Sequence, residues 1–473
     1  MKIIGREREK IEFQELKNSK TSEFVVVYGR RRVGKTFLIR EFFKNKFDFY
    51  HTGILNSPKS TQLQEFNYAL NQISKDVPNT SVNNWFDAFH KLEFILEHSK
   101  NKGKKIIFLD EMPWMATQKS GFMQALDLFW NKWASARKDI LLIVCGSATS
   151  WLFDNIINNT GGMHNRITQK IHLKPFSLLE CETFFKDKKV PMNRRQICET
   201  YMVFGGIPLY LNFFKGNLSV AQNIDNILFS DDALLKNEFS QLYRSLFSNS
   251  EKYIEIVKAL GTKVKGLTRK EILKITKLSN GGGFSEMLND LELSGFIRKY
   301  YSLDKKEQNI IYQLSDFYTL FYFNFIENQN NRDENYWTHL IDNQKHRTWS
   351  GYSFEQLCLE HLQQIKQKLG ISGVLTNTAS WLGEYEDEKA QIDLLIDRND
   401  GIINLCEMKF SKSIFIIDKN TWQNLMTKTE IFRNSSNTTK AIHLTMITPL
   451  GIKTNKYSGD IHSEIKLEDL FKQ

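Results

Sequence analysis

The chain has little of what builds a disulfide framework or a zinc site. Its 473 residues include five cysteines and ten histidines, and no pair of either has metal-ligand spacing. The cysteine number is odd, the positions are scattered, and several lie in apolar runs, which predicts reduced thiols in a core. They are Cys145, Cys181, Cys198, Cys358 and Cys406. Any metal is therefore expected to be magnesium-like and held by oxygen.

Long apolar runs are also missing. A membrane-spanning helix needs about 18 or more consecutive apolar residues, and no stretch approaches that length. The most apolar segment, 317–326, is short and aromatic, which favours a buried helix. The N-terminus, residues 1–7, is charged and has no apolar core behind it. We expect a cytoplasmic protein with no membrane partner.

Length and charge set broader bounds. A chain of 473 residues is long enough for about three domains, each with its own core. The excess of 64 Lys+Arg over 54 Asp+Glu gives a formal net charge of +10. That charge is consistent with a nucleic-acid partner, although charge alone does not require one.

A glycine-rich loop between a strand and a helix is the most informative feature. The apolar run 24–28 predicts a buried parallel strand, and an amphipathic helical pattern follows the loop. In such a loop, backbone N–H groups surround phosphates, Lys35 reaches the β- and γ-phosphate oxygens, and the Thr36 hydroxyl binds Mg²⁺. The residues expected to bind nucleotide here are Gly29, Arg30, Arg31, Arg32, Val33, Gly34, Lys35, Thr36 and Phe37.

Two further strands are expected to end near this loop. The run 104–109 precedes Asp110 and Glu111, and ligands bind at the carboxyl ends of strands in open α/β sheets. Asp110 would hold Mg²⁺ through water, and Glu111 would orient or deprotonate the attacking water. The strand 140–145 ends near Ser147, whose hydroxyl would sense the γ-phosphate. A solvated acidic turn and a plain strand end are the alternatives.

These motifs resemble those of the archaeal-type ATPases of the AAA+/STAND superfamily. The resemblance rests on the segments 4–7, 29–36, 109–111, 145–147, 173–176 and 205–208, and spans nearly the whole chain. It implies ATP as the nucleotide, with Gly5, Arg6 and Pro208 near it, and a helix-breaking turn is the alternative role of Pro208. Arg166 is a candidate arginine finger, within the chain or on a neighbouring subunit of a homo-oligomer, and a solvated surface arginine is the alternative.

The middle of the chain predicts a helical lid and a winged helix. We expect an ATPase core at 1–172, a lid at 173–246, a winged helix at 247–327 and a polar linker at 328–349. Within the winged helix, Thr268 to Glu271 is a capping box, and 295–301 and 308–314 are the expected wing strands. The third helix carries Glu286, Asp290 and Glu292, which would face DNA phosphates unfavourably. The winged helix would therefore either contact DNA or pack against the ATPase.

The segment 350–473 contains a predicted hairpin with charged residues on one face. The runs 391–397 and 402–409 flank an Asn-Asp-Gly turn, after a helix that opens near Gly351. A three-residue loop at 399–401 places Asp393 opposite Glu407. It also places Gln391 opposite Lys409 and turns Ile392, Leu394, Ile396, Cys406 and Met408 to the other face. A two-residue loop would instead put the two carboxylates on different faces.

This pattern resembles the PD-(D/E)XK nuclease core. The resemblance implies that Glu355, Asp393 and Glu407 bind Mg²⁺ and that Lys409 positions the attacking water or stabilises the developing charge. The alternative is a solvated hairpin face.

The expected fold class is therefore α/β: a P-loop parallel-sheet ATPase core with a helical lid, a winged helix and a restriction-endonuclease-like domain. Two functions follow. The first is a Mg²⁺-dependent ATPase coupled to a domain that binds or cuts DNA. The second is an ATP-controlled switch or scaffold with an inactive nuclease-like domain.

Overall fold

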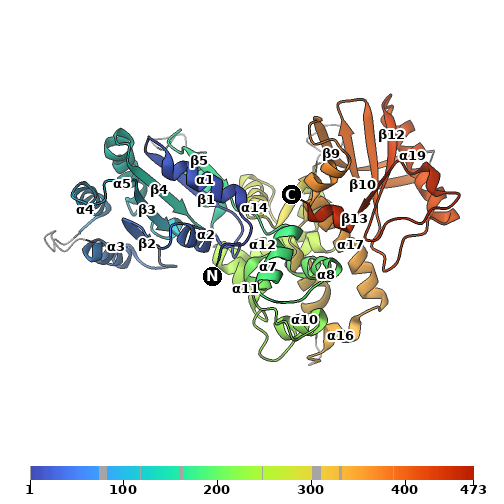
Figure 1. Ribbon diagram of the computed structural model, residues 1–473, viewed down its shortest axis with the longest axis horizontal. Helices are drawn as coiled ribbons and strands as arrows, with labels where there is room; N and C mark the ends of the chain where they lie inside the picture. The colour runs from blue at the N-terminus through green and yellow to red at the C-terminus, as the bar shows by residue number, and fades with distance from the viewer. Residues whose placement is uncertain are drawn as a thin grey trace. The chain divides into compact units, whose positions relative to one another are not determined.

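The computed structural model describes residues 2–73, 82–117, 119–158, 163, 165–247, 249–300, 310–329, 333–386 and 388–472. The chain divides into two compact units, 1–175 and 176–473, shown in Figure 1. No helix among the described residues is long and apolar enough to cross a membrane.

The first unit is built on a five-stranded parallel sheet with the strand order β2-β3-β4-β1-β5. Its three inner strands are runs of Val, Ile, Leu and Phe, as expected for strands covered on both faces. The strands are β1 (Glu23–Tyr28), β2 (Phe49–Thr52), β3 (Lys105–Asp110), β4 (Ile140–Cys145) and β5 (Gln169–His172).

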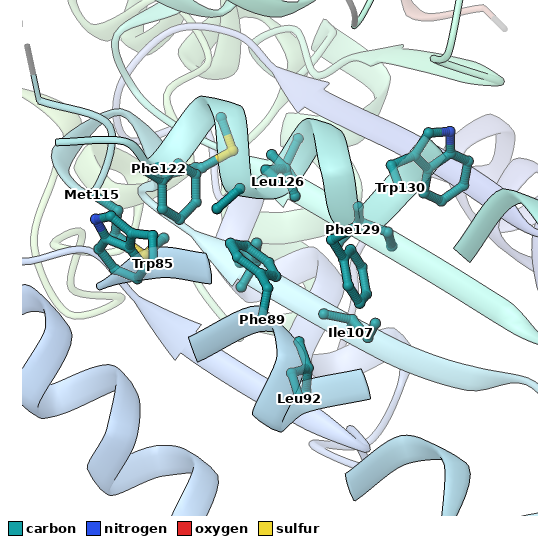
Figure 2. Packing of buried hydrophobic residues seen from close by; sticks show 14 of the residues in the cluster. Trp85, Phe89, Leu92, Ile107, Met115, Phe122, Leu126, Phe129 and Trp130 are labelled. Carbon is teal, nitrogen blue, oxygen red and sulfur yellow. The ribbon is translucent and has the colours of Figure 1, made fainter. Parts of the chain in front are cut away.

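Helices cover both faces of this sheet. One face packs on α3 (Lys59–Ile73), α4 (Trp85–Glu97) and α5 (Phe122–Leu128), and Figure 2 shows Phe89, Phe122 and Phe129 in that core. The other face meets α1 (Glu7–Asn18) and α2 (Lys35–Phe42). Ring contacts of 5.4–6.1 Å link α1 to the sheet, through Phe13, Phe43, Phe47 and Phe108.

The second unit begins with five helices. Three of them open with capping boxes, at Ser177, Asn193 and Ser219. Pro208 occupies the first turn of its helix, where its missing N–H costs nothing. The helices are α7 (Leu178–Asp187), α8 (Arg194–Phe204), α9 (Pro208–Leu211), α10 (Val220–Leu228) and α11 (Glu238–Leu246).

Three helices and a three-stranded sheet follow. The predicted capping box joins Thr268 to Glu271 at the start of the second helix. The elements are α12 (Ser250–Gly261), β6 (Leu267–Thr268), α13 (Arg269–Thr276), α14 (Gly282–Leu293), β7 (Ile297–Tyr300) and β8 (Ile311–Leu314), with the strand order β6-β8-β7. Gln308 and Asn309, predicted to begin the last strand, lie outside the described residues.

The segment predicted as a linker is partly helical. After α15 (Phe317–Phe321), the helices α16 (Tyr336–Leu340) and α17 (Gln344–Glu360) occupy much of 328–349. Trp337 and Trp349 are each 4% exposed and pack edge-to-face at 5.2 Å. The polar composition of this segment gave no sign of these two buried rings. The helix that was expected to open near Gly351 instead begins at Gln344.

The last part of the unit is a second five-stranded sheet with the order β13-β12-β11-β10-β9. Its strands β9, β10 and β11 are antiparallel, and β12 and β13 run parallel to β11. The elements are α18 (Leu362–Lys368), β9 (Thr376–Tyr385), β10 (Glu388–Arg398), β11 (Ile402–Met408), α19 (Lys419–Ser436), β12 (Ala441–Thr448) and β13 (Ser463–Lys466).

The hairpin register is confirmed, but its face assignment is partly wrong. Leu394 pairs with Cys406 and Ile396 with Asn404, as a three-residue loop requires. However, the pairing of β10 with β9 shifts between Ile392 and Leu395. Because this bulge adds a residue, Ile392 joins Leu395 in the cluster that also includes α19 residues, rather than sharing a face with Leu394. Strand β9 was not predicted.

Candidate functional site

Three neighbouring strands of the first unit end at the predicted nucleotide site. In the sheet, β1 lies beside β4 and β4 beside β3. The strands are parallel, so Gly29 after β1, Ser147 after β4 and Asp110 at the end of β3 meet at the same edge. The loop after β1 runs directly into α2.

The glycine loop has the backbone that the motif requires. Gly29 has φ +141°, and a Cβ there would lie 2.2 Å from the Leu173 carbonyl oxygen. Gly34 has φ +91°, with nothing within 4 Å of where a Cβ would stand. The first N–H groups of α2 have no partner within the helix. The loop therefore leads into a helix N-terminus with open space beside Gly34, which suits an anion.

Lys35 is held inside this loop. It is 7% exposed, and its Nζ donates to the carbonyl oxygens of Gly29, at 2.8 Å, and Arg30, at 3.2 Å. Burial lowers its pKa, although Asp110 and Glu111 act in the opposite direction. A phosphate would supply the negative charge that this buried ammonium group requires.

Asp110 and Thr36 meet across the two loops. The Thr36 hydroxyl donates to Asp110 Oδ1 at 3.1 Å, and the Cys145 thiol donates to the same oxygen at 2.6 Å. Asp110 is 4% exposed, and burial raises its pKa. A hydroxyl and a carboxylate in contact are a hard oxygen pair of the kind that binds Mg²⁺ beside a phosphate. Sequence reasoning missed the Cys145 contact because the thiol resembled an ordinary core residue.

Glu111 is bound to Ser147. Its Oε2 accepts hydrogen bonds from the Ser147 backbone N–H at 3.1 Å and from the hydroxyl at 2.9 Å. Glu111 also has φ +46°, which is uncommon for a residue with a side chain and is a feature of functional sites. The predicted water-orienting group and the predicted phosphate sensor therefore contact each other.

Arg6, more than 20 residues before the glycine loop in sequence, makes a hydrogen bond to it. It has φ +60° and follows Gly5, which has φ +62°. Its guanidinium donates to the Val33 carbonyl at 3.3 Å and to the Lys174 carbonyl at 2.8 Å. These bonds connect the glycine loop to the segment after β5.

The remaining predicted residues are placed as follows. Arg30 is 4% exposed, Val33 is 1% exposed and Phe37 is 39% exposed. Arg31 and Arg32 are half-buried, and the backbone of Arg32 has a left-handed conformation, with φ +73°. Arg166 is exposed in the first unit. Pro208 belongs to the second unit, and the other eleven residues predicted to bind nucleotide belong to the first.

The second unit brings the predicted C-terminal residues near one another. Burial and the charge of Asp393 raise the pKa of Glu355 to about 8, with Glu407 adding to the effect. Glu407 is 7% exposed, and its oxygens contact Lys409 Nζ at 2.8 Å and Lys428 Nζ at 2.9 Å. Although burial opposes ionisation, these two ammonium groups hold the pKa of Glu407 below its usual value.

Lysines pair with two of these carboxylates, Asp393 and Glu407. Asp393 Oδ1 lies 3.0 Å from the Nζ atom of Lys265, and Lys265 lies in the turn between α12 and β6. Among the described residues, no group of three or more His, Cys, Asp or Glu side chains is arranged to hold a metal. Sequence reasoning missed Lys265, which lies more than 120 residues before Asp393, and gave Lys428 no role. The helical spacing of α19 was the available signal for Lys428.

A cavity of about 340 Å³ adjoins this cluster. Three parts of the unit line it. The first is the α12–β6 turn, the second is the strand pair β10 and β11 with Lys409 just after β11, and the third is α19. The polar lining residues are Lys265, Lys389, Gln391, Glu407, Lys409, Thr421, Asn424, Thr427 and Lys428.

Comparisons with known proteins support an archaeal-type ATPase domain. Residues 4–214 match the family model described as an ATPase domain predominantly from Archaea. An uncharacterized protein of Methanocaldococcus jannaschii is 22% identical over 416 residues, which cover 86% of this chain and 87% of that protein. An uncharacterized ATP-binding protein of the same organism is 50% identical over 40 residues, which cover 8% of this chain and 68% of that protein.

Among solved structures, a Walker-type ATPase of Pyrococcus abyssi aligns with 68% of this chain and 96% of its own, at 17% identity and a TM-score of 0.48. The ORC2 protein of Aeropyrum pernix aligns with 66% and 91%, at 14% identity and a TM-score of 0.39. Likenesses this low carry no argument about activity. Residues 4–214 of this chain are therefore similar to the archaeal-type ATPase domain, and they contain the motifs that meet at the first site.

Proposed function

We propose that the first unit binds ATP with Mg²⁺ and hydrolyses the bond between its β- and γ-phosphates. The observation that carries this proposal is the convergence of Lys35, Thr36 with Asp110, and Glu111 with Ser147 at the end of three adjacent strands. These residues supply a phosphate-binding cation, a pair of oxygen ligands and a base. Adenine is the proposed nucleobase because residues 4–214 match a family model of an ATPase domain.

The residues would divide the work as follows. Lys35 exchanges the two loop carbonyls for phosphate oxygens, and the N–H groups of α2 add to the charge stabilisation. Thr36 and Asp110 would hold Mg²⁺, which neutralises charge on the β- and γ-phosphates when bound. Glu111 orients and deprotonates the attacking water once Ser147 turns its hydroxyl from Glu111 to the γ-phosphate. Arg166 is proposed as the finger, acting within the chain or on a second subunit.

The test compares nucleotide binding and phosphate release by the wild type and by Lys35→Ala. Lys46→Ala is a matched control, because Lys46 is exposed in the same unit and outside the loop. We expect Lys35→Ala to abolish both activities and Lys46→Ala to preserve them. A GTP competition arm tests the choice of adenine. No binding of either nucleotide to wild-type protein would refute the proposal.

We further propose that the ATPase acts on a DNA-binding second unit. In this proposal 173–246 is a lid, 247–327 a winged helix and 350–473 a nuclease-like domain. The support is the order of elements, in which α17 is followed by three antiparallel strands, α19 and the parallel strand β12. On that framework Glu355, Asp393 and Lys409 lie within electrostatic range of one another.

One observation favours the second candidate, an ATP-controlled switch whose nuclease-like domain does not cut. Both Asp393 and Glu407 already have ammonium partners, where a nuclease would need free carboxylates for Mg²⁺. Nuclease assays with Mg²⁺ or Mn²⁺ separate the candidates, with Asp397→Ala as the control for Asp393→Ala. Metal-dependent nicking that only Asp393→Ala removes supports cutting. DNA-stimulated ATP turnover without nicking supports DNA binding alone, and slow turnover that ignores DNA supports the switch.

A further inference from the structure

The cavity of about 340 Å³ in the second unit has a lining that suits an anion. Four lysines line it, against one acidic side chain among the described lining residues, Glu407. The uncharged lining groups Gln391, Thr421, Asn424 and Thr427 add hydrogen-bond donors. The volume lies within the ~300–1,000 Å³ typical of ligand pockets. A phosphate group fits this charge, these donors and this space.

The lysines come from separate elements, so the cavity exists only in the folded unit. Lys389 lies on β10, Lys409 follows β11, and Lys428 lies on α19. Lys265 comes from the turn after α12, far from the others in sequence. Lys409 and Lys428 converge on Glu407, which keeps two positive charges close together.

The turn that carries Lys265 has a defined structure. The Val264 carbonyl accepts hydrogen bonds from Gln313 Nε2, at 3.0 Å, and from the Tyr352 hydroxyl. Gly266 has φ +89°, and a Cβ there would lie 2.5 Å from the Tyr312 carbonyl oxygen. Lys265 is therefore fixed at its backbone from β8 and α17. Its side chain is 41% exposed and can change partner without moving the turn.

We propose that this cavity is a composite phosphate-binding site in which Lys265 leaves Asp393 to bind the anion. Asp393 holds the ammonium group at the edge of the cavity when no phosphate is present. The inference rests on the DNA-binding part of the proposed function, which names a nucleic-acid backbone as the source of the phosphate. It adds that the α12–β6 turn, outside the nuclease-like domain, supplies part of the site.

Opposite effects of two substitutions test the proposal. Fluorescence anisotropy of a labelled oligonucleotide, single- or double-stranded, measures affinity for the full chain without ATP. Lys265→Ala should weaken binding about tenfold and reduce the slope of log affinity against log salt by about 1. Asp393→Asn should tighten binding severalfold, because it releases Lys265 and removes a negative charge. A purely structural ion pair would instead make both variants weaker.

Two controls keep the result interpretable. Lys263→Ala removes a lysine from the same turn, which pairs with Glu271 and does not line the cavity. It should leave affinity unchanged. Lys265→Arg keeps the charge and should retain binding, which separates loss of charge from loss of folding. ATP hydrolysis by each preparation reports on the first unit separately, so failure here and failure of the ATPase proposal are distinguishable.

The source of the phosphate is read from a second probe. Inorganic phosphate and pyrophosphate are titrated by calorimetry against the same variants. Oligonucleotide binding with the expected signs assigns the site to a nucleic-acid backbone. The same signs with inorganic phosphate and no oligonucleotide binding support the anion site and assign it to a small phosphate compound. No binding of either probe, Lys265→Ala matching Lys263→Ala, or weaker binding by Asp393→Asn would overturn the proposal.

Discussion

The two candidate sites of this protein are positioned by different physical means. In the first unit, parallel strands deliver Lys35, Asp110 and Ser147 to one edge, and glycine backbone angles shape the loop. In the second unit, ion pairs gather lysines and carboxylates from distant segments. A backbone-built site keeps its geometry without ligand, whereas a site built from ion pairs can exchange partners and responds to salt. This contrast leads to four predictions.

The largest effect is expected from Glu111→Gln. The amide keeps the contact with Ser147 but cannot accept a proton, so ATP binding should persist while hydrolysis falls about 10²- to 10⁴-fold. Equilibrium binding of ATP and single-turnover phosphate release measure the two steps. If binding is lost together with turnover, Glu111 shapes the site rather than acting on water.

Gly29→Ala should destabilise the first unit by about 3–4 kcal/mol. The added Cβ meets the Leu173 carbonyl at 2.2 Å in a backbone conformation that side chains disfavour. Urea unfolding read by hydrogen exchange of β1 amides measures the loss. Gly34→Ala is the control, because its φ is positive but the space is open, and about 1–2 kcal/mol is expected. Equal losses at both positions would mean that the clash is relieved.

Acid should weaken the first unit through His51 on β2. Its ring is 6% exposed and packs on Phe66 at 5.0 Å, and burial lowers its pKa to about 4 from an ordinary value of 6.5. Because the folded state disfavours the proton, the stability is complete above pH 6.5. Up to about 3 kcal/mol of it is lost as the pH falls from 6.5 to 4. His51→Phe should flatten that part of the curve, and an unchanged slope would assign it to other groups.

The smallest effect is expected in the second unit. Glu407→Gln leaves two half-exposed lysines without their shared partner and should cost about 1 kcal/mol at low salt, less at high salt. The exposed Lys389–Glu384 pair is the control, and Glu384→Gln should change little. The Gly29→Ala loss should not depend on salt. A salt-independent loss at Glu407 would erase the distinction between the two sites.

Local sequence was informative where one segment contains a whole motif. The glycine loop, the strand ending at Asp110 and the capping box at Thr268 each lie within a few residues, so short-range geometry is readable directly. The hairpin register followed in the same way from the Asn-Asp-Gly turn. The helices within 328–349 were not evident from the sequence because the buried residues Trp337 and Trp349 stand in a segment of polar composition.

The sequence by itself determined the motifs, the parallel sheet of the first unit and the pairing of β10 with β11. Only the tertiary structure decided that β10 has a bulge where it pairs with β9, that Cys145 contacts Asp110, and that Lys265 pairs with Asp393. The physical reason is range. Backbone angles and side-chain alternation are fixed by near neighbours, whereas ion pairs and strand order depend on how remote segments pack.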